Sequence, residues 1–383
     1  MKKLFYFGLL GLAILEILKV YLIMPMPGSQ RMDSIEIAYF IHTYRWYFRG
    51  VLGLMIIVGA LPAFNVRLWW LPIIPALLVG FIVYYFNFEM TAEKIFLAPQ
   101  KELSFKSKTE NILGDTALVI GVVHNGQAKA YPVRYIAYHH QVRDTIGGKP
   151  IMVTYCTVCR TGRVFEPVVN KIYENFRLVG MDHFNAMFED ASTKSWWRQA
   201  TGEAVAGPLA GSLLPELESF QLSANKFFWL YPFGVIMDAD EPSIASYDSL
   251  ARYERGKSKG ALTKRDSLSW KEKSWVVGIV HGSASKAYDW NKLAEERIIN
   301  DSIDDTPIVL ALSDDEQSFV VFRRPSHSEI FSILNDTLRL QKSAYDFSGR
   351  HLSTDSVSLR RINAYQEYWH SWKTFHPNTE VYD

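Results

Sequence analysis

A stretch of this chain recurs, without a gap, 157 residues further on, and no other feature of the sequence constrains the fold as strongly. The string IGVVHNGQAKAYPVRY, which begins at Ile120, aligns with VGIVHGSASKAYDWNK, which begins at Val277. Identical residues continue at the same offset as far as Phe165 and Phe322. A fixed offset of this kind marks a structural unit that is used twice. The sequence therefore predicts two homologous units that pack as a pseudo-symmetric pair.

Each unit has the residue pattern of a strand-rich α+β fold. Short apolar strands alternate with turns, of which His124-Asn125-Gly126 has the composition of a tight hairpin turn. Both copies close on an aromatic amphipathic helix, in ANKFFWLYPFGV near Ala224 and in QEYWHSWKTFHPNTEV near Gln366. We expect a first unit, a polar linker that crosses the surface, and a second unit, over residues 89–240, 241–273 and 274–383.

Residues 1–88 precede these units and have the composition of a membrane anchor. Three apolar runs, at residues 4–26, 47–64 and 68–88, predict three transmembrane helices. Glu16 and Lys19 in the first run are costly in lipid unless they pair, and their spacing of three residues allows pairing on one helix face. An interfacial helix is the alternative interpretation of that run. Lys and Arg counts on the two sides favour a cytoplasmic soluble domain.

Composition limits the remaining function classes. With 41 Lys and Arg against 40 Asp and Glu, the net charge of +1 creates no field that would attract nucleic acid, so we expect no nucleic-acid partner. Two cysteines in 383 residues are too few for a disulfide scaffold, and too few for a four-cysteine zinc site. The membrane is the one partner that the composition indicates.

The two cysteines, Cys156 and Cys159, form a C-x-x-C pair in IMVTYCTVCRTGRVFEP. An apolar strand leads into the pair and Thr161-Gly162 turns the chain into a second strand, so the thiols lie at a strand–turn–strand elbow. This spacing suits a disulfide or redox pair, two ligands of one metal ion, or two inert buried thiols. At the equivalent positions the second copy has Ser313 and Glu316. A single functional site in the first unit is therefore the economical interpretation.

A third ligand would turn the thiol pair into a metal site, and His139 is the candidate. Two thiolates and one imidazole would suit copper or zinc and would leave one coordination position open. We expect Arg160 to stabilise the thiolates and lower their pKa, and Trp197 and Gln199 to line a pocket. Without a metal, the same cysteines would form a redox-active disulfide, although a thioredoxin-like βαβ context is missing from the sequence.

Three strings carry a resemblance to a known family: AYPVRYIAYHHQVRDTIGGKPIMVTYCTVCRTGRVFEP, SWWRQATGEAVAGPLAGSLL and the closing HPNTEV. Residues 89–383 resemble the bacterial domain-of-unknown-function family 3179. The sequence departs from the family pattern at His140, where an acidic residue is usual, and in MDHFNAMFED around His183. The positions that match the family motif are His139, Cys156, Cys159, Trp197, Gln199 and Gly202.

The resemblance implies no established activity, so whether the protein is an enzyme stays open. It implies an extracytoplasmic domain tethered to the bacterial cytoplasmic membrane, and we adopt this location against the charge count. Two functions are then consistent with the residues. One is a metal-binding or thiol-redox site at the C-x-x-C; the other is a non-catalytic, membrane-tethered binding or assembly module whose Cys156–Cys159 disulfide is structural.

Overall fold

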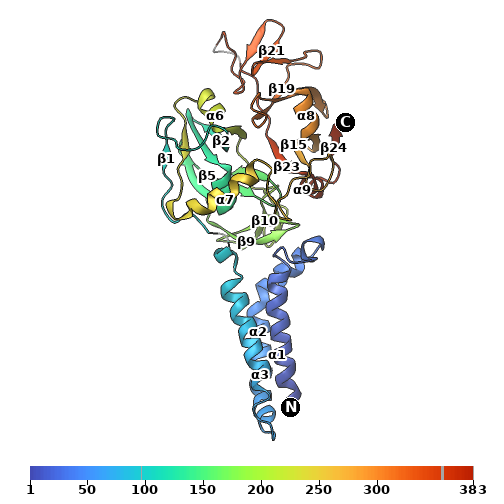
Figure 1. Cartoon of the computed structure of the whole chain (residues 1–383). Helices are drawn as coiled ribbons and strands as arrows, with labels where there is room; N and C mark the ends of the chain where they lie inside the picture. The colour runs from blue at the N-terminus through green and yellow to red at the C-terminus, as the bar shows by residue number, and fades with distance from the viewer. Residues whose placement is uncertain (96, 355–357, 383) are drawn as a thin grey trace. The chain divides into compact units, whose positions relative to one another are not determined.

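The computed structural model describes residues 1–95, 97–354 and 358–382. The chain divides into two compact units, which are described separately (Figure 1). The helical unit contains residues 1–97, 175–198 and 203–213; the soluble unit contains residues 98–174, 199–202 and 214–383. A segment of the expected first repeat therefore belongs to the same compact unit as the membrane helices.

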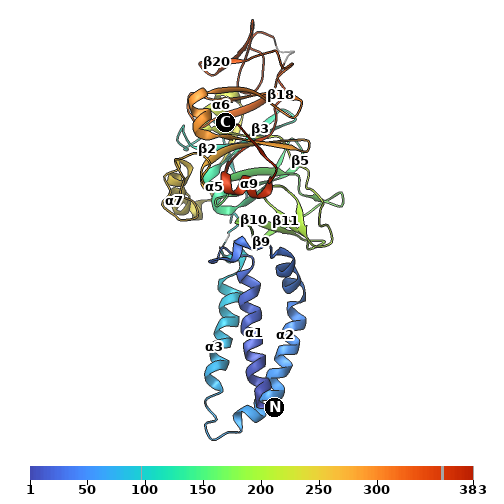
Figure 2. The same cartoon turned by 90° about the vertical axis from the view of Figure 1, so that its right-hand side faces the viewer.

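Three apolar helices form most of the helical unit: α1 (Lys2–Tyr21), α2 (Ile35–Phe64) and α3 (Ile73–Tyr84), which continues as a π-helical turn, Tyr85–Glu89. Two of them, α1 and α2, are long and apolar enough to cross a membrane, whereas the apolar helix over Ile73–Glu89 is shorter. The helices run alternately up and down, so the N-terminus lies at the end opposite to the strands of this unit (Figure 2). A short 3-10 turn (Ser29–Arg31) precedes α2, and α4 (Ala92–Ile95) follows the bundle.

Helix boundaries differ from the apolar runs for local reasons. The second helix begins at Ile35, twelve residues before the expected run, because its first turns are held by packing rather than by lipid: the Tyr39 ring meets Trp196 edge to face at 5.0 Å. The third helix begins at Ile73 and not at residue 68. Pro72 stands directly before it, and a proline disfavours helical backbone in the residue that precedes it.

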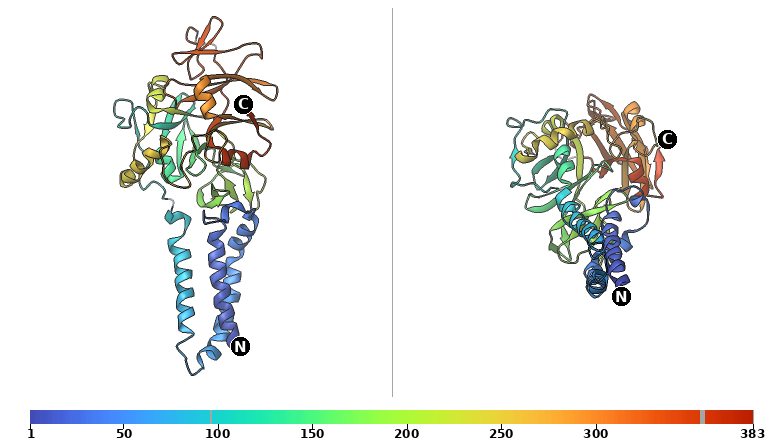
Figure 3. Two further views of the ribbon diagram at one scale, coloured as in Figure 1. Left: turned by 45° about the vertical axis from the view of Figure 1, so that its right-hand side comes forward. Right: turned by 60° about the horizontal axis from the view of Figure 1, so that its bottom comes forward.

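Small residues and one buried carboxylate hold the helices together. α1 and α2 lie side by side (Figure 3), and a Cβ atom added to Gly59 would lie 2.3 Å from the backbone nitrogen of Phe5. Such close approach of backbones is typical of helix packing in membranes. Glu16 is fully buried and accepts hydrogen bonds from Lys19 at 2.8 Å and from Arg49 at 2.6 Å. The expected Glu16–Lys19 pair is present, with Arg49 of α2 as an additional partner.

A four-stranded antiparallel sheet completes the helical unit. Its order is β12-β11-β10-β9, with bounds β9 Phe176–Asp182, β10 Asn185–Asp190, β11 Trp196–Arg198 and β12 Ala204–Ala206. Val179, Met187 and Trp196 pack in one core with Val20 and Ala38 of the helices. This core explains why the sheet and the helices form one unit.

The first half of the soluble unit is built on a five-stranded and a three-stranded sheet, of orders β1-β14-β3-β2-β13 and β4-β5-β6. The strands are β1 Phe105–Lys106, β2 Leu118–His124, β3 Gln127–Pro132, β4 Gln141–Ile146, β5 Lys149–Cys156, β6 Thr161–Phe165, β13 Ser219–Ser223 and β14 Val235–Met237. Helices α5 (Val133–His139) and α6 (Ala224–Leu230) belong to the same half, as does the small β7–β8 ribbon (Val168–Val169 and Ile172–Tyr173).

The second half has the same order of elements and the same pairing. Its strands are β15 Trp275–His281, β16 Ala284–Asp289, β17 Ile298–Ile303, β18 Thr306–Leu312, β19 Phe319–Arg323, β23 Ala364–Tyr368 and β24 Glu380–Tyr382, with helices α8 Trp290–Glu296 and α9 Trp369–Phe375. Sheet β23-β15-β16-β24 repeats β13-β2-β3-β14, including the parallel pairing of the last two strands. Gly121 and Gly278 occupy equivalent register positions, facing Ala130 and Ala287.

The predicted class, N-terminal apolar helices followed by a strand-rich α+β domain, is confirmed by this structure. Homology of the two halves stays a prediction, which their matching topology supports. Between β19 and β23 the second half carries its own small sheet: β20 Ser332–Leu334, β21 Thr337–Leu340 and β22 Ser343–Tyr345. The expected surface linker differs from the structure, because it contains a 3-10 turn (Glu241–Ser243) and α7 (Ile244–Glu254), whose Tyr247 and Tyr253 are buried in the core of the first half.

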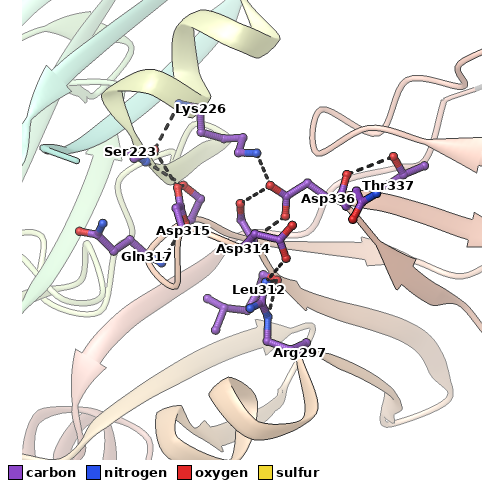
Figure 4. A network of polar contacts seen from close by, with 12 residues as sticks. Ser223, Lys226, Arg297, Leu312, Asp314, Asp315, Gln317, Asp336 and Thr337 are labelled. Carbon is purple, nitrogen blue, oxygen red and sulfur yellow. Dashed lines mark hydrogen bonds and ion pairs between the residues drawn. The ribbon is translucent and has the colours of Figure 1, made fainter. Parts of the chain in front are cut away.

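The halves also meet through a polar network (Figure 4). Ser223, at the N-cap of α6, donates to Asp315 Oδ2 at 2.7 Å. Lys226 of the same helix pairs with Asp336 in the β20–β21 turn, and Asp336 also accepts from the Asp314 backbone at 2.7 Å. The first half thus binds two loops of the second.

Candidate functional site

The C-x-x-C pair lies where β5 ends and the chain turns into β6. Cys156 is the last residue of β5 and pairs in register with Thr161, the first residue of β6. Arg160, which completes the turn, has a φ of 58°, in the left-handed region. Both cysteines are fully buried thiols, and the Cys159 thiol is in hydrogen-bond contact with Cys156. The strand–turn–strand elbow therefore brings the two sulfurs together as predicted.

Residues of the second half enclose this turn. The backbone nitrogen of Tyr368 donates to the carbonyl of Cys159 at 2.8 Å. Lys273 Nζ donates to the carbonyl of Val158, also at 2.8 Å, and His370 Nε2 lies 3.2 Å from the same oxygen. Lys273 Nζ and His370 Nε2 are 2.9 Å apart. The site is therefore composite: the first half contributes the two thiols, and the second half contributes the Lys273 cation, which directly precedes it, and the His370 imidazole.

Glu367 of β23 and Ser371 of α9 extend the cluster. The Cys159 thiol contacts Ser371, whose hydroxyl donates to Glu367 Oε1 at 2.5 Å. Glu367 Oε2 lies 3.7 Å from Arg163 Nη2, and neither atom has a hydrogen-bond partner among the residues that the structure describes. The cluster of Cys156, Cys159, Lys273, Glu367, His370 and Ser371 is called the thiol site below.

Burial sets the protonation states of the thiol site. It raises the pKa of the Cys159 thiol well above its ordinary value, and the neighbouring Cys156 acts in the same direction. Burial also raises the pKa of the Glu367 carboxyl and lowers the pKa of Lys273, although negative charge on the two cysteines, when ionised, opposes the shift of Lys273. Burial lowers the pKa of His370 to about 4, so its imidazole is neutral at pH 7. The site therefore favours protonated thiols.

His139, the candidate third ligand, contacts α7. His139 is buried at the end of α5, and its Nε2 lies 2.5 Å from the Tyr247 hydroxyl on α7. Within residues 1–95, 97–354 and 358–382, no three His, Cys, Asp or Glu side chains form a group that could hold a metal ion. A copper or zinc site at Cys156, Cys159 and His139 stays a prediction.

Arg160 has a different role from the one expected. Its guanidinium donates to Gln366 Oε1 at 2.9 Å and to the carbonyls of Tyr253 and Glu254 at 3.2 and 2.8 Å. It therefore caps the C-terminus of α7, where a cation is favoured by the helix dipole. Arg160 also lies 3.8 Å from the centre of the Trp275 ring. Burial raises the pKa of the Cys159 thiol, and stabilisation of the thiolates by Arg160 stays a prediction.

Gln199 and Trp197 belong to different compact units. The Gln199 amide donates to Thr154 Oγ1 at 3.0 Å and to the carbonyl of Thr161 at 3.1 Å, so it ties together the two strands that carry the cysteine turn. The Trp197 indole donates to Asp190 Oδ2 at 2.9 Å within the helical unit. A pocket lined by both stays a prediction.

The two other histidines that the sequence draws attention to have structural surroundings. His140 caps α5 with a φ of 60° and places Nδ1 3.1 Å from the carbonyl of Tyr155; burial lowers its pKa to about 4. Arg297, its equivalent in the second half, contacts the carbonyl of Leu312 in the same way. His183 lies in the β9–β10 turn and contacts Asp182 at 2.6 Å.

Sequence reasoning missed Lys273, Glu367, His370 and Ser371. The signal was available in the closing segments, which match at an offset of 145 residues: β13 and β23, and then α6 and α9, coincide. At this offset Glu367 and His370 replace Leu222 and Asn225 of the first copy. Each copy is therefore specialised at a different place, and the comparison of copies identified only the cysteines.

A family model described as "Protein of unknown function (DUF3179)" matches residues 101–379. The chain belongs to this family. The DUF3179 match includes both halves, the cysteine turn and the closing α9 segment, and it begins after the three apolar helices. No curated protein matches the chain, and no solved structure does so either.

Proposed function

We propose that this DUF3179 protein is a membrane-anchored thiol-redox module in which Cys156 and Cys159 alternate between a dithiol and a disulfide. The observation that carries the proposal is the thiol site itself: two buried thiols in contact, enclosed by Lys273, His370 and Ser371. A turn that needed the cysteines only for packing would not require a half-buried cation and an imidazole beside them.

Oxidation of the pair would transfer two electrons to a disulfide-bearing oxidant. One thiol of the pair attacks the oxidant, a mixed disulfide forms, and the second thiol resolves it, so that the oxidant leaves as two thiols. The attacking thiol must lose its proton, and Lys273 is the group whose charge stabilises the thiolate. Because the raised pKa of Cys159 limits stabilisation of the thiolate, we expect a reducing pair and not a strong oxidant.

A redox titration tests this function. The full chain in detergent would be equilibrated with thiol–disulfide buffers, and the free thiols would be trapped and counted by mass. Catalytic pairs have potentials of about −120 to −270 mV, whereas structural disulfides lie below about −300 mV. We expect a value in the catalytic range that falls by about 30 mV in Lys273→Met, since a tenfold change in the equilibrium corresponds to about 30 mV. The exposed neighbour Lys271 gives the control, Lys271→Met.

The second candidate is a binding or assembly module with a structural Cys156–Cys159 disulfide. The complete burial of both sulfurs favours it, because a buried pair meets a protein partner only after local opening. This candidate predicts a potential below about −300 mV and an unaltered cellular function in the Cys156→Ser, Cys159→Ser double variant. That combined result would exclude the redox function.

We propose further that the anchor crosses the bacterial cytoplasmic membrane three times and places the soluble unit outside the cytoplasm. In the count of Lys and Arg residues, Arg49 is one of the cations that favour a cytoplasmic soluble domain. Its guanidinium, however, is neutralised by Glu16 inside the bundle. Labelling of intact cells with an impermeant maleimide tests the topology. With both native cysteines replaced by serine, Lys108→Cys should react from outside, and Val66→Cys, in the turn after α2, should react only after lysis. The reverse pattern would place the soluble unit inside.

A further inference from the structure

A small basic pocket lies within the helical unit, apart from the thiol site. Its volume is about 130 Å³. The charged and titratable side chains of its lining are Lys19, His42, Arg45 and Arg177, which come from α1, α2 and β9. The lining contains no carboxylate among the described residues. Its apolar wall is formed by Val20, Ile23, Phe86, Met90, Ala92 and Val179.

The two carboxylates nearest to these cations are already engaged. Glu16 accepts from Lys19, Arg49 and Asn87, and Glu189 accepts from Arg177 at 2.8 Å and from the Trp196 indole at 3.0 Å. The Arg45 guanidinium donates to the carbonyl of His42 on its own helix, and no carboxylate pairs with it in the described part of the chain. Four cations, Lys19, Arg45, Arg49 and Arg177, therefore stand against two carboxylates, which leaves an excess positive charge at the pocket.

The pocket lies at the level where a bilayer would end. A membrane-spanning helix needs about 20 residues, and about 20 residues counted back from Phe64, the last residue of α2, reach Arg45. Lys19 lies near the C-terminal end of α1. Phe86 lies in the π-helical turn that follows α3. Below this level large apolar side chains are exposed around the helices, such as Leu10, Ile57, Leu61, Leu77 and Phe81. Lipid headgroups would surround the mouth of the pocket.

We propose that this pocket binds the phosphate of an anionic membrane phospholipid, with Arg45 as the principal ligand. A guanidinium binds phosphate through two parallel hydrogen bonds, and the apolar wall would accept the first methylene groups of the acyl chains. Basic pockets between membrane helices are known to hold lipid headgroups. A choline headgroup would be disfavoured, because its own positive charge would face the cations of the pocket.

The test measures binding of short-chain phosphatidylglycerol to the full chain in neutral detergent, by native mass spectrometry. We expect Arg45→Gln to weaken binding about tenfold, the effect of losing one charge-assisted contact. Arg31→Gln removes an exposed arginine from the loop at the same end of the helices, and it should leave the affinity unchanged. Phosphatidylcholine of equal chain length should bind more weakly than phosphatidylglycerol.

Three results would overturn the proposal. The first is equal affinity of the Arg45→Gln variant and the wild type. The second is an equal loss in Arg31→Gln, which would indicate a diffuse surface attraction. The third is inorganic phosphate binding as tightly as the lipid, which would assign the pocket to a free anion. Gln keeps a helix propensity similar to that of Arg, and thermal unfolding of each variant verifies that the bundle is intact.

Discussion

His370 should make the soluble unit sensitive to acid. Burial lowers its pKa to about 4, whereas the ordinary value is about 6.5. The unfolded chain therefore binds the proton more readily than the folded chain between these two values. The stability that this group contributes is fully present above pH 6.5 and is lost as the pH falls towards 4. The difference between the two pKa values corresponds to about 3 kcal/mol of unfolding free energy at pH 4.

The assay is urea unfolding of the full chain in detergent, followed by tryptophan fluorescence between pH 7 and pH 4. We expect the loss of stability over this range to be smaller by about 3 kcal/mol in His370→Gln than in the wild type. His140, whose pKa burial also lowers to about 4, should give a second decrease of similar size in His140→Gln. Glu367, with a raised pKa, acts in the opposite sense in every variant and largely cancels in the comparison.

A matched control separates this effect from general acid damage. His327 is exposed, and His327→Gln should retain the pH dependence of the wild type. If His370→Gln and the wild type lose the same free energy between pH 7 and pH 4, the imidazole is not held neutral by burial. The description of the thiol site as a low-polarity environment would then be wrong.

Three further substitutions test the packing. A Cβ atom at Gly121 would lie 2.1 Å from the ring of Phe220, so Gly121→Ala should lower the unfolding free energy by about 1–3 kcal/mol in the urea assay, and an unchanged midpoint would contradict this contact. Arg160→Met would remove the guanidinium donors to the last two carbonyls of α7, of which Tyr253 keeps the Gly256 backbone donor, and should cost about 3 kcal/mol; a loss below about 0.5 kcal/mol would refute the capping role. Gly59→Leu should lower the thermal stability of the helical unit, while Gly80→Leu, which meets nothing within 4 Å, should not; equal effects would argue against close packing of α1 on α2.

Much of the architecture was predictable because it depends on local pattern. The apolar runs predicted the helical anchor, and the spacing of Glu16 and Lys19 predicted their pairing. The offset of 157 residues predicted equivalent elements. The structure has them at β2 to β5 in the first half and at β15 to β18 in the second half. Helix ends were less predictable, since the first turns of α2 depend on contacts with the distant strand β11. The burial of α7 was missed because polar and charged side chains interrupt its apolar residues, although Tyr247 and Tyr253 are buried.

The sequence by itself determined which residues could react, and the tertiary structure decided what surrounds them. The C-x-x-C spacing brings Cys156 and Cys159 together because Cys156 ends β5 and Cys159 lies in the tight turn that follows it. Their partners are remote: Lys273 lies 115 positions and His370 lies 212 positions from Val158, whose carbonyl both contact. No periodicity in the sequence predicts which surface of one half packs against the other. Burial is therefore the main cause of the raised pKa of the Cys159 thiol.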